Sequence, residues 1–186
     1  PIFTFMGAHT VRQDDEFSSS ALQQTIAKVI PALAANGSSS LSYEIEFLLT
    51  SFVAAFQHIP RHRRVKLFTS LTKTLSYKHS LHIILFLMGQ QYSNNITRNK
   101  AHESISILEF TSAFLKNFSA QEQLEGVEKF YQLWNQIPNA QLEPNSDEFN
   151  ALSSRSIFGV SILSLSKSGL LTFKSQLLNF IDKVLD

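Results

Sequence analysis

Apolar residues recur along this chain with the spacing of an α-helix nearly from end to end. Leu22, Ile26, Val29, Ile30 and Leu33 follow one another at intervals of one, three and four residues, which places them on one helical face. The same spacing predicts further helices over residues 45–56, 61–75, 80–91, 101–118, 120–134, 154–166 and 169–184. Residues 92–99 and 138–147 are polar and are predicted to be loops. The pattern therefore predicts an all-α protein of eight helices.

The predicted helices form pairs at a nearly constant interval. The first members of the pairs begin near Ser20, Arg61 and Ala101, about 41 residues apart, and then near Ser154 after the longer loop. Helix pairs with a period of about 40–47 residues are typical of HEAT repeats, and Pro31 should kink the first helix as in such repeats. We therefore predict that residues 1–186 form a single α-solenoid segment of about four HEAT-like pairs, cut from a longer chain. The alternative is a compact helical bundle, which would not need the constant interval.

Composition supports a helical domain with a substantial core. Hydrophobic residues make up 44% of the chain, while only 6 Gly and 5 Pro are present, too few for the many tight turns of an all-β protein. The absence of cysteine excludes disulfides and thiol chemistry. The longest apolar run, residues 81–88, is far shorter than the ~20 residues that span a bilayer. We expect no membrane segment.

Charges are sorted along the chain, although the net charge is only +1. Residues 1–60 and 101–150 are acidic on balance, whereas residues 61–100 contain eight basic side chains and no acidic one. A basic stretch of this kind is an electrostatic signal for a polyanion. Six of its members form the candidate surface for a polyanion or protein partner, namely Arg63, Lys66, Lys73, Lys78, Arg98 and Lys100.

A helical wheel divides the basic residues near position 61 into two groups. With Val65 at zero, the apolar arc of this helix covers about 240° to 360°. Arg61 and Arg64 fall inside the arc, at about 320° and 260°, so we expect them to point into the interface with the neighbouring repeat. Arg63, Lys66 and Lys73 fall on the outer face. A solvated face is the alternative interpretation of these three residues.

Other polar clusters have simpler interpretations than catalysis. Asp14, Asp15 and Glu16 suit a loop or the start of a helix. His79 and His82 have a spacing that metal ligands use, but no third ligand is evident nearby. The chain contains neither a nucleophile elbow nor a phosphate-binding glycine loop. We therefore expect no catalytic, cofactor-binding or metal-binding residue and no small-molecule substrate.

Two aromatic patterns are expected to lie in the core. Phe110, Phe114 and Phe118 recur every four residues and should pack inside, although an exposed position would make them a groove for a partner helix. The apolar stripe of the sixth helix, made of Leu124, Val127, Tyr131 and Trp134, should be buried as well.

Several motifs resemble one family. They are Ile2-Phe3-Thr4-Phe5-Met6-Gly7, Arg12-Gln13-Asp14-Asp15, Val29-Ile30-Pro31-Ala32-Leu33, and Ile59-Pro60 followed by His62-Arg63-Arg64 and Leu67-Phe68. With these motifs the chain resembles the large HEAT-repeat small-nucleolar-RNA-associated proteins of the small-subunit processome, in their yeast-type form. The resemblance is specific over residues 1–90 and generic beyond them.

The resemblance implies a non-catalytic scaffold in the nucleolus. Its implied role is small-subunit pre-rRNA processing and pre-ribosome assembly, within the UtpA subcomplex. Other UtpA-type proteins are the implied partners, with pre-rRNA or small nucleolar RNA as candidate partners. The alternative function is a generic protein-interaction solenoid, an adaptor or transport scaffold that binds no nucleic acid. An enzyme ranks third.

Overall fold

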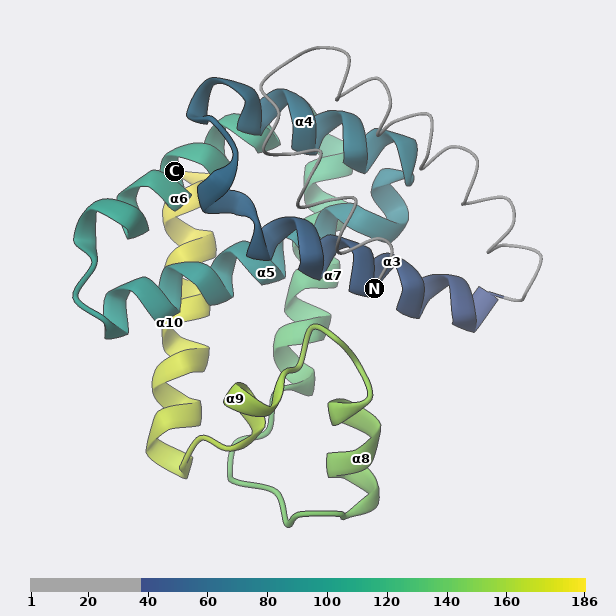
Figure 1. Cartoon of the computed structure of the whole chain (residues 1–186), viewed down its shortest axis with the longest axis vertical. Coiled ribbons are helices and arrows are strands. Elements are labelled where there is room, and N and C mark those ends of the chain that lie inside the picture. Colours follow the sequence, from purple (N-terminus) through teal and green to yellow (C-terminus); the bar gives the residue numbers. More distant parts are fainter. Residues whose placement is uncertain (1–37) are drawn as a thin grey trace.

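A computed structural model of the chain describes residues 38–186 (Figure 1). Within this range all regular secondary structure is helical, as predicted. The elements are α3 (Ser38–Ala54), the 3-10 turn η1 (Phe56–His58), α4 (Arg61–Thr74), α5 (Tyr77–Thr97), α6 (Ala101–Leu115), α7 (Ala120–Gln136), α8 (Asp147–Ser153), α9 (Val160–Leu163) and α10 (Lys167–Leu185). The helix predicted over residues 22–33 lies outside the described residues.

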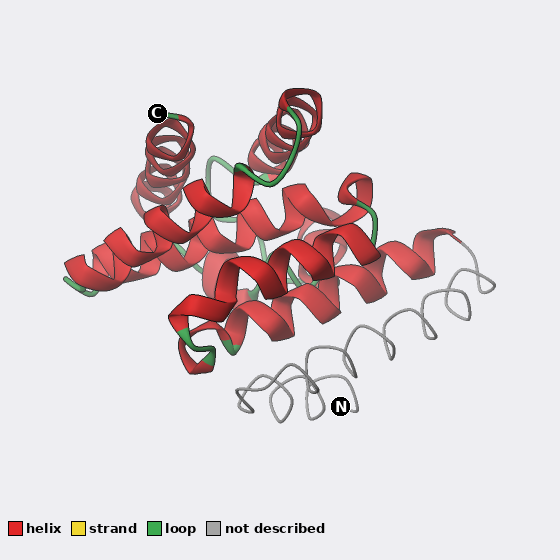
Figure 2. Ribbon diagram, turned by 90° about the horizontal axis from the view of Figure 1, so that it is seen from above, coloured by secondary structure: helices red, strands yellow, loops and turns green. Residues whose placement is uncertain are grey.

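Two consecutive helix pairs, α4 with α5 and α6 with α7, carry the repeat. The pairs begin at Arg61 and Ala101, 40 residues apart, as the HEAT-type period predicts. First helices pack on first helices, α4 on α6, and second helices on second helices, α5 on α7. Helix α3 packs on α5 in the same manner and takes the place of the second helix of the preceding pair. Figure 2 shows helices of this block lying side by side, while in Figure 1 α7 runs across the direction of α5. The predicted all-α HEAT-like stacking is thus confirmed.

Helix α5 is the centre of the molecule. It packs against α3, α6, α7 and α10, which explains why its sequence is apolar nearly all round. The helix extends through Thr97, so the predicted loop at residues 92–99 is wrong for most of its length. The reason is tertiary, because Tyr92 and Ser93 are buried and meet Phe180 and Gln176 of α10. These contacts hold a polar segment in the helical conformation.

Phenylalanine rings join the repeats at their interfaces. Phe110 lies at the hub, with its ring centroid 4.9 Å from Phe56, 5.3 Å from Phe68 and 5.7 Å from Phe114. Phe118 extends the row at 5.2 Å from Phe114. The predicted core position of Phe110, Phe114 and Phe118 is confirmed, since all three are buried.

The stripe predicted for α7 is wrong in part. Leu124 is 68% exposed and Tyr131 is exposed as well, while Trp134 is half-buried. The inward face instead carries Gly126, Val127, Phe130 and Leu133. Its position is set by a close approach to α5, because a Cβ at Gly126 would lie only 2.8 Å from Leu81 Cδ2. The Ser119–Glu122 capping box at the start of α7 is present, as predicted.

The last pair departs from regular stacking. Residues 154–166 were predicted to form one helix, but only α9, four residues long, forms there. The preceding helix, α8, starts at Asp147 because the Ser146 side chain caps it by accepting a hydrogen bond from Phe149 N. Between α8 and α9 the chain buries Ile157 and Phe158 without helical structure.

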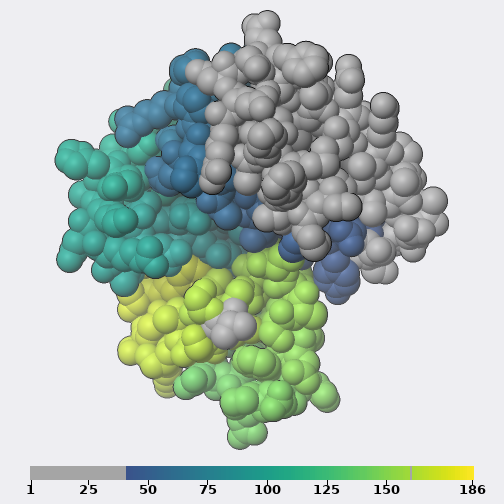
Figure 3. Space-filling model, viewed as in Figure 1, coloured from purple at the N-terminus to yellow at the C-terminus, as the bar shows by residue number. Residues whose placement is uncertain are grey.

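Helix α10 packs mainly on α5, which it crosses as α7 does. It packs on α5 and α6, with a smaller contact to α7, and in Figure 1 it runs across the direction of α5. The crossing is close, because a Cβ at Gly89 would lie 2.7 Å from Leu177 Cδ2. In Figure 3 the chain from α8 to α10 forms the lower part of the molecule, coloured green to yellow. Among the described residues no helix is long and apolar enough to traverse a lipid bilayer.

Candidate functional site

The first group of basic residues is that of α4, and it begins directly after Pro60, the N-cap of this helix. Arg64 is 6% exposed. Its Nε donates to Ile59 O at 2.9 Å, and its Cζ lies 4.1 Å from the centre of the Phe56 ring. Burial, and then the neighbouring Arg61 charge, lowers the pKa of Arg64. Arg64 therefore lies at the junction between α4 and the segment that follows α3, held by a carbonyl and a ring rather than a carboxylate.

Arg61 does not share this environment. It is exposed, so its predicted place inside the apolar arc is wrong. Arg61 is the first residue of α4, where the helix has just emerged from the corner at Pro60 and its side chain reaches solvent. Arg64, one turn further into the packed part of the helix, is buried, as the helical wheel predicts.

The outward-facing lysines of α4 are where the wheel places them. Lys66 and Lys73 are exposed, and Arg63 is half-buried. Lys73 Nζ lies 5.7 Å from the centre of the Phe118 ring, at the junction with α6. Lys66 has neither a hydrogen bond nor an ion pair within residues 38–186.

Acidic residues from α7 approach one end of the basic stretch. The pKa of Glu122 is lowered, first by its hydrogen bonds with Ser119 and also by the charge of Lys73. The pKa of Tyr77, next to Lys78, is raised by burial and by the adjacent Glu125 carboxylate. Lys129 Nζ also donates to Lys78 O at 2.8 Å. The basic stretch, which contains no acidic residue in sequence, is thus partly neutralised in space at Lys73.

A second basic group lies at the other end of α5, on the turn to α6. Lys100 N donates to Asn95 O at 2.8 Å and Asn99 N to Ile96 O at 3.1 Å, while Asn99 adopts φ 56°. These features form a Schellman motif, which Asn accommodates because it tolerates the left-handed conformation. The motif projects Arg98 and Lys100 into solvent, at the helix end whose dipole favours cations.

The six candidate residues therefore do not form one cluster. Lys73 and Lys78 flank the α4–α5 turn, and Arg98 and Lys100 flank the α5–α6 turn. These turns are separated by the length of α5, 21 residues, or about 30 Å at 1.5 Å per residue. Sequence proximity alone gave no indication of this separation.

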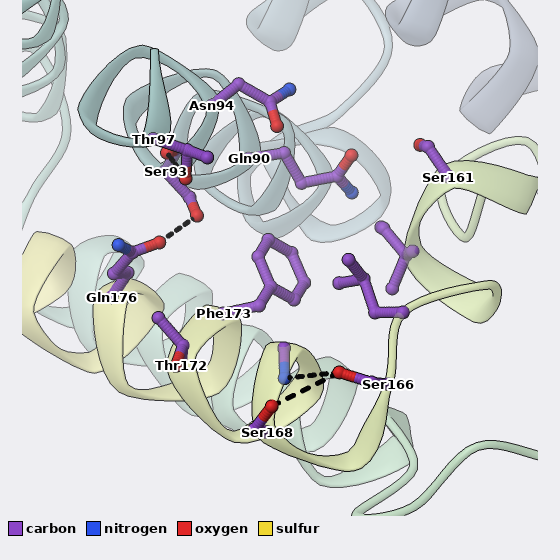
Figure 4. A pocket seen from close by; sticks show the side chains of 13 residues that line it. Gln90, Ser93, Asn94, Thr97, Ser161, Ser166, Ser168, Thr172, Phe173 and Gln176 are labelled. Atoms are coloured by element: carbon purple, nitrogen blue, oxygen red, sulfur yellow. Dashed lines mark hydrogen bonds between the residues drawn. The ribbon is translucent and has the colours of Figure 1, made fainter. Parts of the chain in front are cut away.

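A polar pocket that sequence reasoning missed lies beside the second basic group (Figure 4). It has a volume of about 340 Å³ and lies between the C-terminal part of α5, α9 and the first turns of α10. Its hydroxyl and amide side chains belong to Gln90, Ser93, Asn94, Thr97, Ser161, Ser166, Ser168, Thr172 and Gln176. The available signal was the run of polar residues after Gly89, which was interpreted as a loop.

A partly buried polar network joins the last pair to α3. Arg155, between α8 and α9, contacts Glu46 of α3 through both carboxylate oxygens, Nη2–Oε1 at 2.5 Å and Nε–Oε2 at 3.4 Å. Arg155 Nη1 also donates to Gln136 Oε1 at 2.6 Å. The pKa of His82 is lowered to about 4 by burial and by the charges of Lys129 and Arg155. None of these side chains lines the polar pocket.

A buried lysine connects α10 with α7. Lys174 Nζ donates to Ile137 O and Asn139 Oδ1, at 3.0 and 2.9 Å, and lies 4.2 Å from the centre of the Trp134 ring. Burial lowers the pKa of Lys174. On the outside of α10, Leu171, Leu178 and Leu185 are exposed at seven-residue intervals, which aligns them along one side of the helix.

The described part of the chain contains no arrangement of side chains that supports a metal site. His79 is exposed whereas His82 is packed inside, so the two do not converge. No group of three His, Asp or Glu side chains in residues 38–186 is arranged to hold a metal ion. Asp14, Asp15 and Glu16 lie outside the described residues.

Comparison with known proteins gives consistent results. The family model described as "HEATR1-like, HEAT repeats" matches residues 40–186. The chain is 71% identical over 184 residues to the "U3 small nucleolar RNA-associated protein 10" of Scheffersomyces stipitis, and 63% identical over 185 residues to that of Candida albicans. It is 41% identical over 184 residues to the protein of the same name from Saccharomyces cerevisiae. No solved structure matches the chain significantly.

These alignments cover nearly all of this chain but little of the relatives. They include 99%, 100% and 99% of the chain, in the same order, and 10% of each relative. The chain thus spans about a tenth of the length of the curated relatives it matches. The family match extends over most of the chain and coincides with the helix pairs seen in the structure. The chain therefore belongs to the family of HEATR1-like HEAT-repeat proteins.

Proposed function

We propose that this chain is a non-catalytic scaffold segment of a nucleolar ribosome-biogenesis factor. Its role is in small-subunit pre-rRNA processing and pre-ribosome assembly, as part of a longer HEAT-repeat protein. The observation that carries the proposal is the high identity, along the whole chain, to proteins named for association with U3 small nucleolar RNA. The stacked helix pairs provide extended surfaces of the kind that solenoids use for binding.

The finer assignments follow from the same proposal. The expected location is the nucleolus, the expected protein partners are other UtpA-type components of the small-subunit processome, and the expected RNA partners are U3 small nucleolar RNA or pre-rRNA. The exposed lysines and arginines on α4 and at the α5–α6 turn support an RNA contact.

Depletion of the whole protein from the cells that carry it tests this function directly. Mature small-subunit rRNA should fall and its unprocessed precursors should accumulate, while large-subunit rRNA changes less. A tagged copy should co-purify U3 RNA together with processome proteins. Normal processing after depletion, with no U3 RNA on the tagged protein, would show the proposal to be wrong.

The outward face of α4 is the part of the proposal that concerns polyanions. Lys66, Lys73 and Arg63 are proposed to contact RNA backbone or an acidic partner. Lys66 is the sharpest probe, because it is exposed and pairs with none of the described residues. Lys73 is a weaker probe, since its charge already interacts with Glu122.

Charge reversal separates this surface from a solvated face. Lys66→Glu should weaken binding to RNA of every sequence about equally, and should flatten the dependence of log K on log salt by about one unit. Lys183→Glu, an exposed lysine on α10, is the control with the same change in charge and should bind as wild type does. Equal binding by both variants would assign the α4 face to solvent.

The alternative function, a protein-interaction solenoid without RNA, is favoured by one feature. The exposed leucines 171, 178 and 185 on α10 are suited to contact a neighbouring helical repeat of the same longer protein, because the relatives are about ten times the length of this chain. The absence of RNA binding, together with loss of partner proteins when these leucines are replaced, would favour this alternative.

A further inference from the structure

The polar pocket between α5, α9 and α10 has an unusual lining. Nine of its thirteen lining residues carry a hydroxyl or an amide, and none of the thirteen is charged. The remaining surface is apolar and includes Phe173, whose ring lies between α10 and α5 in Figure 4. Such a lining suits neither an ion, which would find no opposite charge, nor an apolar ligand, which would leave polar groups unpaired.

Several of these polar groups retain hydrogen-bonding capacity. Gln90 donates through Nε2 to Ile157 O at 2.6 Å, which leaves its Oε1 as an acceptor. Gln176 accepts from Ser93 through Oε1, which leaves its Nε2 as a donor. The side chain of Asn94 is exposed, and its amide makes no hydrogen bond within the described chain. The pocket thus presents an acceptor, a donor and a complete amide.

A neutral ring with alternating donors and acceptors fits this set. Asn and Gln amides pair with base edges through two hydrogen bonds, and unpaired RNA bases are recognised in this way, with their faces against apolar or aromatic side chains. The volume of about 340 Å³ exceeds that of one base, so a base can enter while remaining attached to its sugar.

The surroundings supply the charge that a nucleotide requires. Arg98 directly follows Thr97, which lines the pocket, and Lys167 lies between the lining residues Ser166 and Ser168. Both cations are exposed. A peptide main chain offers the same hydrogen-bonding pattern as a base, but it carries no phosphate for these cations.

We propose that this pocket binds one unpaired base of single-stranded RNA, with the flanking phosphates against Arg98 and Lys167. The inference rests on the proposed association of the protein with RNA and deepens it by assigning a base-reading site. Phosphate contacts give affinity without sequence preference, whereas base contacts give preference. Replacing a residue that contacts phosphate should therefore lower affinity for every sequence, whereas replacing one that contacts the base should remove the sequence preference.

The test is fluorescence anisotropy with short labelled homopolymers of A, C and U and the 186-residue chain. Wild type should prefer one homopolymer by about tenfold, in the range of one base contact. Asn94→Ala should remove most of that preference and leave the salt slope unchanged. Gln132→Ala, which removes an exposed amide of α7 that makes no hydrogen bond, is the matched control and should retain the preference.

Arg98→Ala provides the complementary result. It should weaken binding to all three homopolymers alike and flatten the salt slope by about one unit. Salt-dependent RNA binding without base preference, or a preference that Asn94→Ala leaves intact, would overturn the pocket assignment while the proposed function stands. The absence of RNA binding would overturn the pocket assignment as well, and normal rRNA processing after depletion would separately reject the proposed function. Stronger competition by an uncharged peptide than by RNA would assign the pocket to a polypeptide.

Discussion

The block from α4 to α7 and the segment from α8 to α10 are built by different means. In the first, helix pairs begin 40 residues apart, and α4 meets α6 through the rings of Phe68 and Phe110. In the second, two short helices and an irregular chain lead to α10, which crosses α5. The apolar side of α10 joins the common core, and polar and charged contacts are added to it through Arg155, Lys174 and the Ser93–Gln176 hydrogen bond.

The difference shows how a repeat protein acquires a local site. Regular stacking buries apolar faces continuously and leaves few enclosed polar surfaces between neighbouring helices. Where α10 leaves that register, the polar end of α5 and the polar start of α10 face each other and form the pocket of Figure 4. The irregular pair is thus the part of this segment in which a specific ligand site can arise.

The largest expected effect comes from breaking the ion pair that joins the second region to α3. Arg155→Met leaves the Glu46 carboxylate, 4% exposed, without its partner, and should lower the free energy of unfolding by about 3 kcal/mol or more. Urea unfolding followed by circular dichroism measures the change. Lys167→Met, an exposed lysine, should have little effect. Combining Arg155→Met with Glu46→Leu should restore much of the loss; two additive losses would show that the residues act independently.

Acid should destabilise the junction between the regions through His82. Its pKa is about 4 in the folded chain against about 6.5 when unfolded. The unfolded state therefore binds more protons between these values. The contribution of His82 to the free energy of unfolding is constant above about pH 6.5 and is lost as the pH drops toward 4, by up to about 3 kcal/mol. His82→Gln should reduce this dependence, whereas His79→Gln, at an exposed position, should keep it. An unchanged pH dependence in His82→Gln would contradict the assignment.

Two glycines test the close helix crossings in each region. Gly126→Ala acts on the regular α5–α7 contact and Gly89→Ala on the α5–α10 crossing, and each added Cβ meets a buried leucine at under 3 Å. Each should cost about 1–3 kcal/mol through overpacking. Gly159→Ala is the control, because its nearest neighbour would lie 3.7 Å away. If Gly89→Ala were as stable as the control in thermal melts, α10 would not cross α5 as closely as described.

The smallest effect distinguishes two cations on α4. Arg64→Ala removes the bond to Ile59 O and the contact with the Phe56 ring and should cost about 1–2 kcal/mol. Lys66→Ala should stay within about 0.5 kcal/mol of wild type, as is usual for exposed residues. Equal melting temperatures for the two variants would reject the bracing role predicted for Arg64.

Apolar spacing was sufficient to predict α3 to α7, because these helices bury a continuous face against neighbours of the same kind. It failed where the burial of polar residues decides the conformation. The segment from Tyr92 to Thr97 is helical owing to its contact with α10, about 85 residues away in sequence. The chain near Ile157 and Phe158 is irregular although its spacing suggests a helix.

The candidate site was predictable only in outline. The wheel correctly separated Arg64 from Lys66 and Lys73, but it placed Arg61 on the wrong side, because it ignores where the packed surface ends. The charge pattern could not show that Glu122 and Glu125 approach Lys73 and Tyr77, nor that Arg98 and Lys100 lie at the far end of α5. The pocket depends on the packing of three helices, so no local sequence motif predicts it.

This segment is expected to contact RNA at the α5–α6 turn and in the adjoining pocket. The measurement that shows such a contact is ultraviolet crosslinking of the whole protein to RNA in its own cells, followed by mass spectrometry of the peptides that carry nucleotide adducts. We expect adducts on the peptides that contain Asn94 to Lys100 and Ser166 to Gln176, and their loss at the first peptide in an Asn94→Ala, Arg98→Ala variant. RNA adducts elsewhere in the protein but on neither peptide would contradict the claim.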